Sequence, residues 1–428
     1  DINEEWISDK TRYACDGLLN QRLDVPYVKY NNNFEKASWK EVFNIIKSKI
    51  ENSNKENICG FVGDLTNMET SFIFKEFFER TLNSKKYESR TSDRFIDNSS
   101  RENYIFNSTI NGIEESDFIF LIGANPRFEA TMINARIRKA YLNNKTKIIS
   151  LNDVGDLTYP YEALDGETQS IKDVVENNNS LSQAILDSKK PMIIIGESFL
   201  DLEKSEYLFN SLKKFLYKNK KFTNEWNPLN ILSTDASSVG NFDLDIINNN
   251  EMLLKDLKEN KFEIVFLVGQ DNIDFKKKDE FVIYQGSHGD KGAELADIIL
   301  PGSAFTEQSS HYTNLEGKIQ KTFKASYPPG EAKEDWQIIN ELAELMNNRK
   351  LFNDKEELQS SMFNYLNIKK EKQKSNFVDN KIEDNFVNEY LKVNYKDYYF
   401  SNVIARSSKT MVDCNNTKHE IKLTGTEG

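Results

Sequence analysis

Cysteine and histidine are scarce in this 428-residue chain. It has three cysteines, which lie far apart in the sequence: Cys15, Cys59 and Cys414. Cysteines at this separation build neither a disulfide framework nor a CxxC metal site. The histidines also number three: His288, His311 and His419. So small a number argues against a histidine-rich catalytic or zinc centre.

Positive charge and long apolar segments are also in short supply. The chain has 56 Lys and Arg against 68 Asp and Glu, a formal net charge of −12, and no long basic run. This balance argues against nucleic acid or an anionic lipid surface as the main partner. The longest apolar runs, at 118–122, 192–195 and 264–268, fall far short of the roughly 20 residues that a membrane-spanning helix needs. No direct membrane span is therefore expected.

Glycine (18 residues) and proline (8 residues) are scarce, whereas asparagine, lysine, isoleucine and phenylalanine are abundant. No folding argument requires this bias, and A/T-rich coding would produce it. We infer an organellar or otherwise A/T-rich genome.

The sequence does contain a repeated pattern of short apolar runs that alternate with helical segments. The predicted strands cover residues 58–63, 117–123, 147–151, 191–196, 262–269, 281–284 and 297–300. Continuous apolar strands between amphipathic helices are typical of parallel sheets covered on both faces. The predicted fold class is therefore α/β, with two or more parallel-sheet units and a helical C-terminal region.

This pattern divides the chain into four parts. Residues 1–40 are interpreted as an extended leader and residues 41–190 as the first α/β unit. Residues 191–350 form the second α/β unit with its connection, and residues 351–428 form a helical, charged C-terminal region. Ser38 is predicted to cap the first long helix at its N terminus.

Three polar segments are predicted to connect these elements: 153–179, 223–250 and 369–385. A terminal element, residues 397–411, is not explained by packing of the main domain. We expect it to lie across another subunit or to close the edge of the domain.

A turn at residues 123–129 follows one predicted strand and opens a helix. An α/β sheet binds phosphate at such a place, beside the N terminus of a helix. Gly123, Asn125 and Arg127 are the candidate contacts. A GxGxxG pattern is absent, however, and Asn125 with the proline after it also fits a simple tight turn. The spacing leaves nucleotide binding and a structural turn both open.

A second turn, residues 286–292, contains three glycines that let the backbone approach a ligand closely. Gly286 and His288 are its candidate ligand-binding residues, and His288 with Asp290 or Asp297 would form a proton-transfer pair. The alternative is a glycine-rich connection with a surface histidine. We favour the connection, because no nucleophile accompanies the pair and neither a GxSxG elbow nor a P-loop is present.

A polar stretch, residues 306–317, follows the last predicted strand. It could line a cofactor cleft or form a hairpin with residues 318–323, whose alternation predicts a strand. The residue types leave both interpretations open.

Several motifs are informative through the identities of their residues as well as through their spacing. They occur in this order: NEEWISDKTRYACDGL (3–18), RENY (101–104), GANPRFEATMINARIR (123–138), DLTY (156–159), YQGSHG (284–289), ADIILPG (296–302), NLEG (314–317), PPG (328–330), EDW (334–336) and SNVIARSSKTM (401–411). Together they resemble the carboxyl-terminal domain of the large iron–sulfur subunit family of respiratory complex I, the NADH–quinone oxidoreductase. The resemblance spans nearly the whole chain.

That domain is similar in turn to the molybdopterin oxidoreductases, which implies their multi-domain α/β fold but not their activity. Catalytic relatives place Cys, selenocysteine, Ser or Asp on the metal, whereas the matching region here offers Glu102, Asn103 and Tyr104. Ser8 stands where some relatives have a cluster-binding cysteine, and a hydroxyl is a poor substitute for a thiolate. With these departures, we expect no catalytic residue, no metal site and no cofactor in this chain.

The resemblance implies a non-catalytic structural subunit in the peripheral, matrix-side arm of complex I at the mitochondrial inner membrane. It would support electron transfer from NADH to ubiquinone coupled to proton translocation, with FMN and the iron–sulfur clusters on partner chains. The expected partners are other peripheral-arm subunits and the cluster-bearing amino-terminal half. We expect that half to be a separate chain, joined through residues 1–40.

Two alternatives are weighed against this function. An active molybdopterin oxidoreductase, similar to formate dehydrogenase, would bind pterin in a cleft near residues 123–127 and 286–292. A vestigial nucleotide site would use Arg127, Arg136 and Arg138 to contact phosphate. A solvated helix face or a protein interface explains these arginines better.

Overall fold

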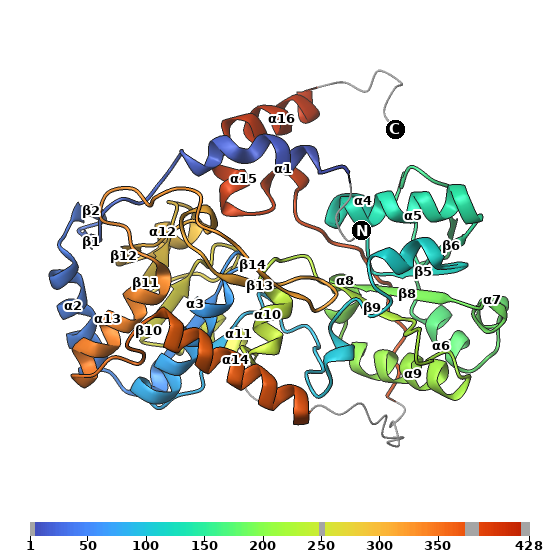
Figure 1. The fold of residues 1–428 in the computed structure, drawn as a ribbon, viewed down its shortest axis with the longest axis horizontal. Helices are drawn as coiled ribbons and strands as arrows, with labels where there is room; N and C mark the ends of the chain where they lie inside the picture. Colours follow the sequence, from blue (N-terminus) through green and yellow to red (C-terminus); the bar gives the residue numbers. More distant parts are fainter. Residues whose placement is uncertain (1–4, 248–252, 373–384, 421–428) are drawn as a thin grey trace.

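Two parallel-sheet lobes make up the protein, as a computed structural model shows for residues 5–247, 253–372 and 385–420 (Figure 1). Within these residues the larger sheet has seven strands and the smaller sheet has five. The prediction of an α/β fold with two parallel-sheet units is confirmed. No helix in the described residues combines the length and the apolarity needed to cross a membrane.

The larger sheet combines five parallel strands with an antiparallel hairpin at one edge. In spatial order its strands are β2 (Asn33–Lys36), β1 (Tyr27–Tyr30), β12 (Ile298–Pro301), β11 (Phe281–Gly286), β10 (Ile264–Val268), β3 (Ile58–Val62) and β4 (Tyr87–Glu88). In the central strand β10, Leu267 pairs with Phe61 of β3 and with Tyr284 of β11. Every residue of β3 and β10 is buried, as the continuous apolar runs predict.

The smaller sheet is parallel throughout. In spatial order its strands are β7 (Glu162–Ala163), β6 (Lys147–Ser150), β5 (Phe118–Ile122), β8 (Pro191–Gly196) and β9 (Leu229–Leu232). The central strands β5 and β8 are buried along their whole length. A parallel strand of this kind needs helices on both faces of its sheet.

Helices cover both faces of each sheet (Figure 1). One core of the larger lobe joins its sheet to α2 (Trp39–Glu51), α3 (Met68–Phe77), α13 (Asp335–Asn347) and α14 (Lys355–Lys372). The opposite core holds α11 (Leu253–Lys258) and α12 (Lys291–Leu295). The predicted cap is confirmed, because the Ser38 hydroxyl accepts a hydrogen bond from the Glu41 backbone nitrogen at 3.3 Å.

The smaller lobe follows the same plan. One face of its sheet packs on α6 (Gln169–Val175), α7 (Ser180–Asp187) and α9 (Ser205–Lys218). The other face packs on α5 (Thr131–Asn144). Two one-turn helices, α4 (Pro126–Glu129) and α8 (Glu197–Leu200), begin close to the carboxyl ends of β5 and β8.

Strand pairing divides the chain differently from the expected boundary at residue 190. β8, which begins at Pro191, pairs with β5 in the smaller sheet, whereas β10 pairs with β3 in the larger sheet. The smaller lobe is therefore inserted between β4 and β10. Of the expected connections, residues 153–179 contain β7 and α6, and residues 223–250 contain β9 and α10 (Ser238–Asp243). Apolar runs locate strands but do not encode which strands become neighbours.

Residues 5–40 do not form an extended leader, which corrects the expectation for residues 1–40; residues 1–4 lie outside the described residues. They form α1 (Asp9–Tyr13), the turn η1 (Ala14–Leu18) and the hairpin β1–β2. Val28 of β1 is 5% exposed and pairs with Ile298 of β12. This short, polar hairpin gains its stability from a partner strand about 270 residues away, so local periodicity gives no sign of it.

The C-terminal region returns across the molecule. Its helices α15 (Val403–Ser407) and α16 (Lys409–Glu420) pack against η1 and α1 at the other end of the chain (Figure 1). The terminal element thus closes an edge of its own domain, one of the two placements expected for it. Of the predicted connection 369–385, residues 373–384 lie outside the described residues.

Candidate functional site

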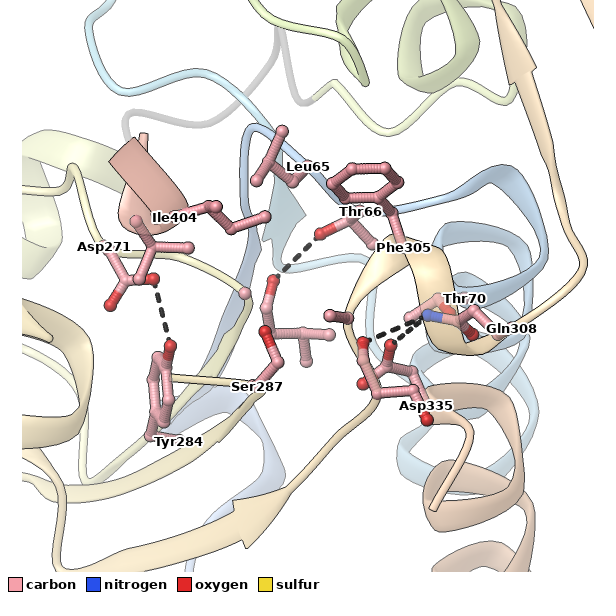
Figure 2. Close-up of a pocket in the computed structure, with 16 residues that line it drawn as sticks. Leu65, Thr66, Thr70, Asp271, Tyr284, Ser287, Phe305, Gln308, Asp335 and Ile404 are labelled. Atoms are coloured by element: carbon pink, nitrogen blue, oxygen red, sulfur yellow. Dashed lines mark hydrogen bonds between the residues drawn. The ribbon is translucent and has the colours of Figure 1, made fainter. Parts of the chain in front are cut away.

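Loops that follow the strands of the larger sheet enclose a small cavity. These loops and the turn η6 (Phe305–Glu307) provide most of its wall, together with Thr70 of α3. Figure 2 shows Asp271 and Tyr284 on one side of the cavity and Gln308 and Asp335 on the other. The cavity volume is about 50 Å³, which gives room for a few water molecules.

Two buried carboxyl groups stand in the cavity wall. Burial, together with the charge of nearby Asp290, raises the pKa of Asp271 to about 7, although the Tyr284 hydroxyl donates to its Oδ2 at 3.0 Å. Burial also raises the pKa of Asp335 to about 6, against a hydrogen bond from Gln308. The described residues that line the cavity include no lysine or arginine. The wall is therefore acidic where a phosphate group would need positive charge.

This cavity does not fit a molybdopterin. Sites for small molecules commonly measure roughly 300–1,000 Å³, far more than the volume found here. The phosphate of the pterin would face Asp271 and Asp335 without a cation. No cysteine lies among the described lining residues, so the wall offers no thiolate for a metal.

Helix α15 closes the cavity on the side away from the sheet. Its residues Val403 and Ile404 belong to the cavity wall, and Figure 2 shows Ile404 between Asp271 and Leu65. The guanidinium of Arg406 donates to Asp290 at 2.6 Å, which fixes α15 to the loop after β11. The C-terminal segment of the chain thus covers the strand ends of the larger sheet.

Between the two lobes, Lys396 joins strand ends from both sheets. Its Nζ lies 2.6 Å from Oδ1 of Asp235, in the loop after β9, and 3.6 Å from Oδ2 of Asp64, in the loop after β3. Burial raises the pKa of Asp235 to about 6 against the opposing charge of Lys396. The pKa of Lys396 is itself raised, because Asp235 and Asp64 outweigh the effect of its burial.

The backbone around Lys396 is fixed to the smaller lobe. Asn394 donates from its backbone nitrogen to the Ser198 hydroxyl at 2.9 Å. The ring of Tyr395 stacks on Phe128, with centroids 5.0 Å apart and an angle of 10° between the planes. We call residues 385–400 the strap. It covers the turn at residues 123–129 and places the Lys396 ammonium between the lobes.

The three candidate contacts of that turn serve the turn itself. Gly123 has φ +67°, and a Cβ there would lie 2.6 Å from the backbone nitrogen of Phe199. Asn125 is buried and donates through Nδ2 to the Val154 carbonyl at 3.0 Å. Arg127 donates to the Asp156 carboxylate at 2.7 Å. Gly123 thus serves close packing, and the Asn125 amide nitrogen and the Arg127 guanidinium each have a protein partner. A vestigial phosphate site at this turn stays a prediction.

The second candidate turn holds a buried histidine, which corrects the expectation of a surface residue. His288 is 0% exposed, and its Nε2 lies 2.9 Å from the Gly17 carbonyl oxygen. Burial lowers the pKa of His288 to about 4, against this hydrogen bond. The proposed proton-transfer partners are engaged elsewhere, Asp290 with Arg406 and Asp297 with Lys277. Gly286 lies in the cavity wall.

His288 gives a pH-dependent contribution to stability. The folded-state pKa lies below the unfolded value, so the unfolded chain binds the extra proton and stability falls as the pH drops from about 6.5 to about 4. We expect a loss of about 3 kcal/mol across this range from the pKa of about 4. Urea unfolding of the purified chain at pH 7 and at pH 4.5 measures this loss in the free energy of unfolding. In His288→Gln this part of the pH dependence should vanish; an unchanged dependence would contradict the assignment.

Ser8, at the position of a cluster cysteine in some relatives, caps a helix. Its hydroxyl accepts a hydrogen bond from the Thr11 backbone nitrogen at 3.2 Å, at the start of α1. Cys15 is exposed a few residues further on. In the described part of the chain, no three His, Cys, Asp or Glu side chains gather closely enough to hold a metal ion.

Other candidate residues find protein partners. The polar stretch left open by the sequence forms a hairpin, β13 (His311–Thr313) with β14 (Ile319–Lys321). The His311 ring contacts the buried carboxylate of Glu69 at 2.6 Å. The pairing of β13 with β14 confirms the hairpin alternative for the polar stretch.

Arg136, a candidate phosphate contact, pairs with Glu114 at 2.8 Å.

Lys396 and its acidic partners Asp64 and Asp235 were not predicted from the sequence as site residues. A carboxylate just after a predicted strand, as at Asp64, is a usable signal, because the carboxyl ends of parallel strands meet at one edge of a sheet. Lys396 lies in an irregular polar segment and carries no local signal.

Three family descriptions match the sequence. Residues 22–345 match "Molybdopterin oxidoreductase". Residues 1–16 match "NADH-ubiquinone oxidoreductase NDSU1/NuoG-like, 4Fe-4S domain". Residues 358–414 match the C-terminal family of the G-type subunit of NADH-ubiquinone oxidoreductase.

Curated relatives point in the same direction. The NADH-ubiquinone oxidoreductase 75 kDa subunit of Reclinomonas americana is 37% identical over 439 residues, which covers 97% of this chain and 63% of that protein. The mitochondrial NADH-ubiquinone oxidoreductase 78 kDa subunit of Candida albicans is 36% identical over 440 residues, which covers 97% and 59%. The chain thus spans less than two thirds of the length of these relatives. The resemblance inferred from the motifs is confirmed.

Among solved structures, a chain of the formyltransferase/hydrolase complex from Methylorubrum extorquens is similar, with a TM-score of 0.52 and 12% identity. The match covers 76% of this chain and 99% of that chain, and at this identity it supports the fold alone. The family match over residues 22–345, the paired parallel sheets and the curated relatives agree. The chain belongs to the molybdopterin oxidoreductase family, and within it is similar to the 75 kDa and 78 kDa subunits of NADH–ubiquinone oxidoreductase.

Proposed function

We propose that this chain is a non-catalytic structural part of the peripheral, matrix-side arm of respiratory complex I at the mitochondrial inner membrane. It supports electron transfer from NADH to ubiquinone coupled to proton translocation, but carries no electrons itself. The curated relatives, which are subunits of NADH–ubiquinone or NADH–quinone oxidoreductase, support this placement.

The filled strand ends are the observation that carries the non-catalytic role. In an open α/β sheet, ligands bind outside the carboxyl ends of the strands. Here α15 covers those ends in the larger lobe, and the strap places Lys396 between Asp64 and Asp235. The space left measures about 50 Å³ and has an acidic wall.

The redox groups of the assembly lie outside these 428 residues in this proposal. The three cysteines are too few to hold an iron–sulfur cluster, and Cys59 is buried in β3. FMN and the clusters belong to other parts of the assembly, among them a cluster-bearing amino-terminal half. Together with the other peripheral-arm subunits, this half is the expected neighbour of α1 and η1.

Isolation of the native assembly tests the proposal. We expect the chain to migrate on native gels with NADH dehydrogenase activity and with other complex I subunits, which mass spectrometry identifies.

Cofactor analysis of the purified chain tests the non-catalytic role separately. We expect no stoichiometric iron, molybdenum or tungsten and no fluorescent oxidised pterin after denaturation. Stoichiometric metal or pterin would refute this part of the proposal. Migration of the chain without respiratory partners would refute the subunit role.

A further inference from the structure

An exposed basic segment, residues 317–330, stands out on an acidic protein. It contains Lys318, Lys321 and Lys324 and no aspartate or glutamate, although the whole chain has a net charge of −12. All three lysines are exposed. The segment comprises β14, the second strand of the hairpin, and the loop after it. We call the whole of residues 317–330 the basic loop.

The basic loop presents aromatic rings to solvent. Tyr327 is 84% exposed and Phe323 is 73% exposed, and Phe305 from the adjoining turn η6 is 42% exposed. Most phenylalanines of the described chain are instead buried in the two lobes. Exposed aromatic rings are typical of the central residues of protein interfaces, whereas charged side chains are found at the polar rim.

Backbone hydrogen bonds hold this segment in place. Thr322 donates from its backbone nitrogen to the Ser310 carbonyl at 2.7 Å, and Ala325 donates to the Thr306 carbonyl at 2.8 Å. The Lys324 backbone nitrogen donates to the Ser309 hydroxyl at 3.0 Å. Because the backbone is fixed, the aromatic rings are kept away from the core, and a partner that binds them has little ordering cost to overcome.

The lysines stay close to the rings. The Lys324 Nζ lies 4.6 Å from the centre of the Tyr327 ring, and the Lys321 Nζ lies 5.6 Å from that of Phe323. These cation–π contacts form a mixed basic and aromatic surface. The segment itself contains no carboxylate, and Glu316 and Glu331 lie just outside its two ends. Its charge is complementary to an acidic surface.

We propose that the basic loop docks an acidic protein surface of another subunit. The inference rests on the proposed function, which places this chain in a multi-subunit assembly. Apolar contact with Phe323 and Tyr327 supplies affinity, and the lysines select an acidic partner and favour its approach. Nucleic acid is disfavoured as the occupant, because the chain as a whole repels a polyanion.

Paired substitutions test the docking surface in the native assembly. We expect Phe323→Ser with Tyr327→Ser to weaken incorporation of the chain at least about tenfold, because the apolar contact is lost. Lys321→Glu with Lys324→Glu should also weaken it, and the defect should shrink as salt rises. The melting temperature of the purified chain should stay unchanged, since these side chains are exposed. Tyr217→Ser on α9, whose ring is 50% exposed, is the matched control and should incorporate normally.

A photo-crosslinking residue at position 327 identifies the occupant directly. The expected product joins this chain to an acidic peptide of another subunit. A crosslink to a basic peptide, to lipid, to nucleic acid or to a second copy of this chain would overturn the inference, as would normal incorporation of both double variants. In each of these cases, a wild-type chain that still migrates with the complex leaves the proposed function intact. If the wild-type chain migrates alone, both the proposed subunit role and the docking inference are refuted.

Discussion

Gly123→Ala should lower the free energy of unfolding by about 4 kcal/mol. Gly123 has φ +67°, and an added Cβ would lie 2.6 Å from the Phe199 backbone nitrogen and 2.9 Å from its Cβ. The left-handed backbone costs an alanine about 1–2 kcal/mol. Overpacking adds about 1–3 kcal/mol, because a backbone atom cannot move aside as a flexible side chain can.

Gly155 provides the matched control. It also has positive φ, +80°, but an added Cβ would meet nothing within 4 Å. Gly155→Ala should therefore cost only the backbone strain, about 1 kcal/mol. The two values come from urea unfolding of the purified chain followed by circular dichroism.

The comparison separates two roles for Gly123. If this glycine serves close packing between the turn after β5 and helix α8, the large effect appears without any ligand. If Gly123→Ala proves as mild as Gly155→Ala, the packing role is wrong. A vestigial phosphate-binding role would then regain support.

Lys396→Met should destabilise the chain by about 2 kcal/mol at pH 8. The substitution leaves Asp64 and Asp235 without their shared cation between the lobes; their side chains are 6% and 19% exposed. Loss of one partner of a fully buried ion pair costs about 3–5 kcal/mol. The Lys396 side chain is 34% exposed, so solvent screening reduces the expected loss.

The destabilisation caused by Lys396→Met should increase as the pH rises. Burial already holds the pKa of Asp235 near 6, with Lys396 opposing the shift, so removal of Lys396 raises this pKa further. The folded variant then binds a proton that the unfolded chain releases, and its stability falls as the pH rises from about 4 to 8. The destabilisation should accordingly be smaller at pH 5.5 than at pH 8.

A double-mutant cycle isolates this interaction. Asp235→Asn combined with Lys396→Met should recover part of the lost stability at pH 8, because one of the two uncompensated charges is gone while Asp64 remains. Lys258→Met removes a lysine at an exposed position of α11 and should have little effect. Equal losses for Lys396→Met and Lys258→Met would show that the strap does not join the lobes through charge.

The central strands of both sheets, β3, β5, β8 and β10, could be predicted because each is an apolar run buried on both faces. β8, predicted as residues 191–196, occupies that range, and β5 and β10 differ from their predicted ranges only at the ends. The cap at Ser38 was equally local, since it depends on residues three positions apart. Such features require no knowledge of the rest of the chain.

The candidate site was predictable only in part. The two turns lie at strand ends, as expected, and Gly286 does line the cavity. His288 was expected at the surface, yet η1 covers it from a segment about 270 residues away. Nothing near Lys396 in the sequence indicates Asp64 or Asp235, because the chain passes through both lobes between them.

The sequence by itself determined the α/β class, the positions of the buried strands and the family, because these follow from local apolar runs and from motifs read in order. Only the tertiary structure decided that the smaller lobe is inserted into the larger, that the hairpin β1–β2 joins the larger sheet, and that α15 and the strap fill the strand ends. These outcomes depend on which distant segments meet. A buried strand satisfies its hydrogen bonds with any neighbour of suitable register, and a buried charge with any opposite charge in reach, so the identity of the partner is set by the packing of the whole chain.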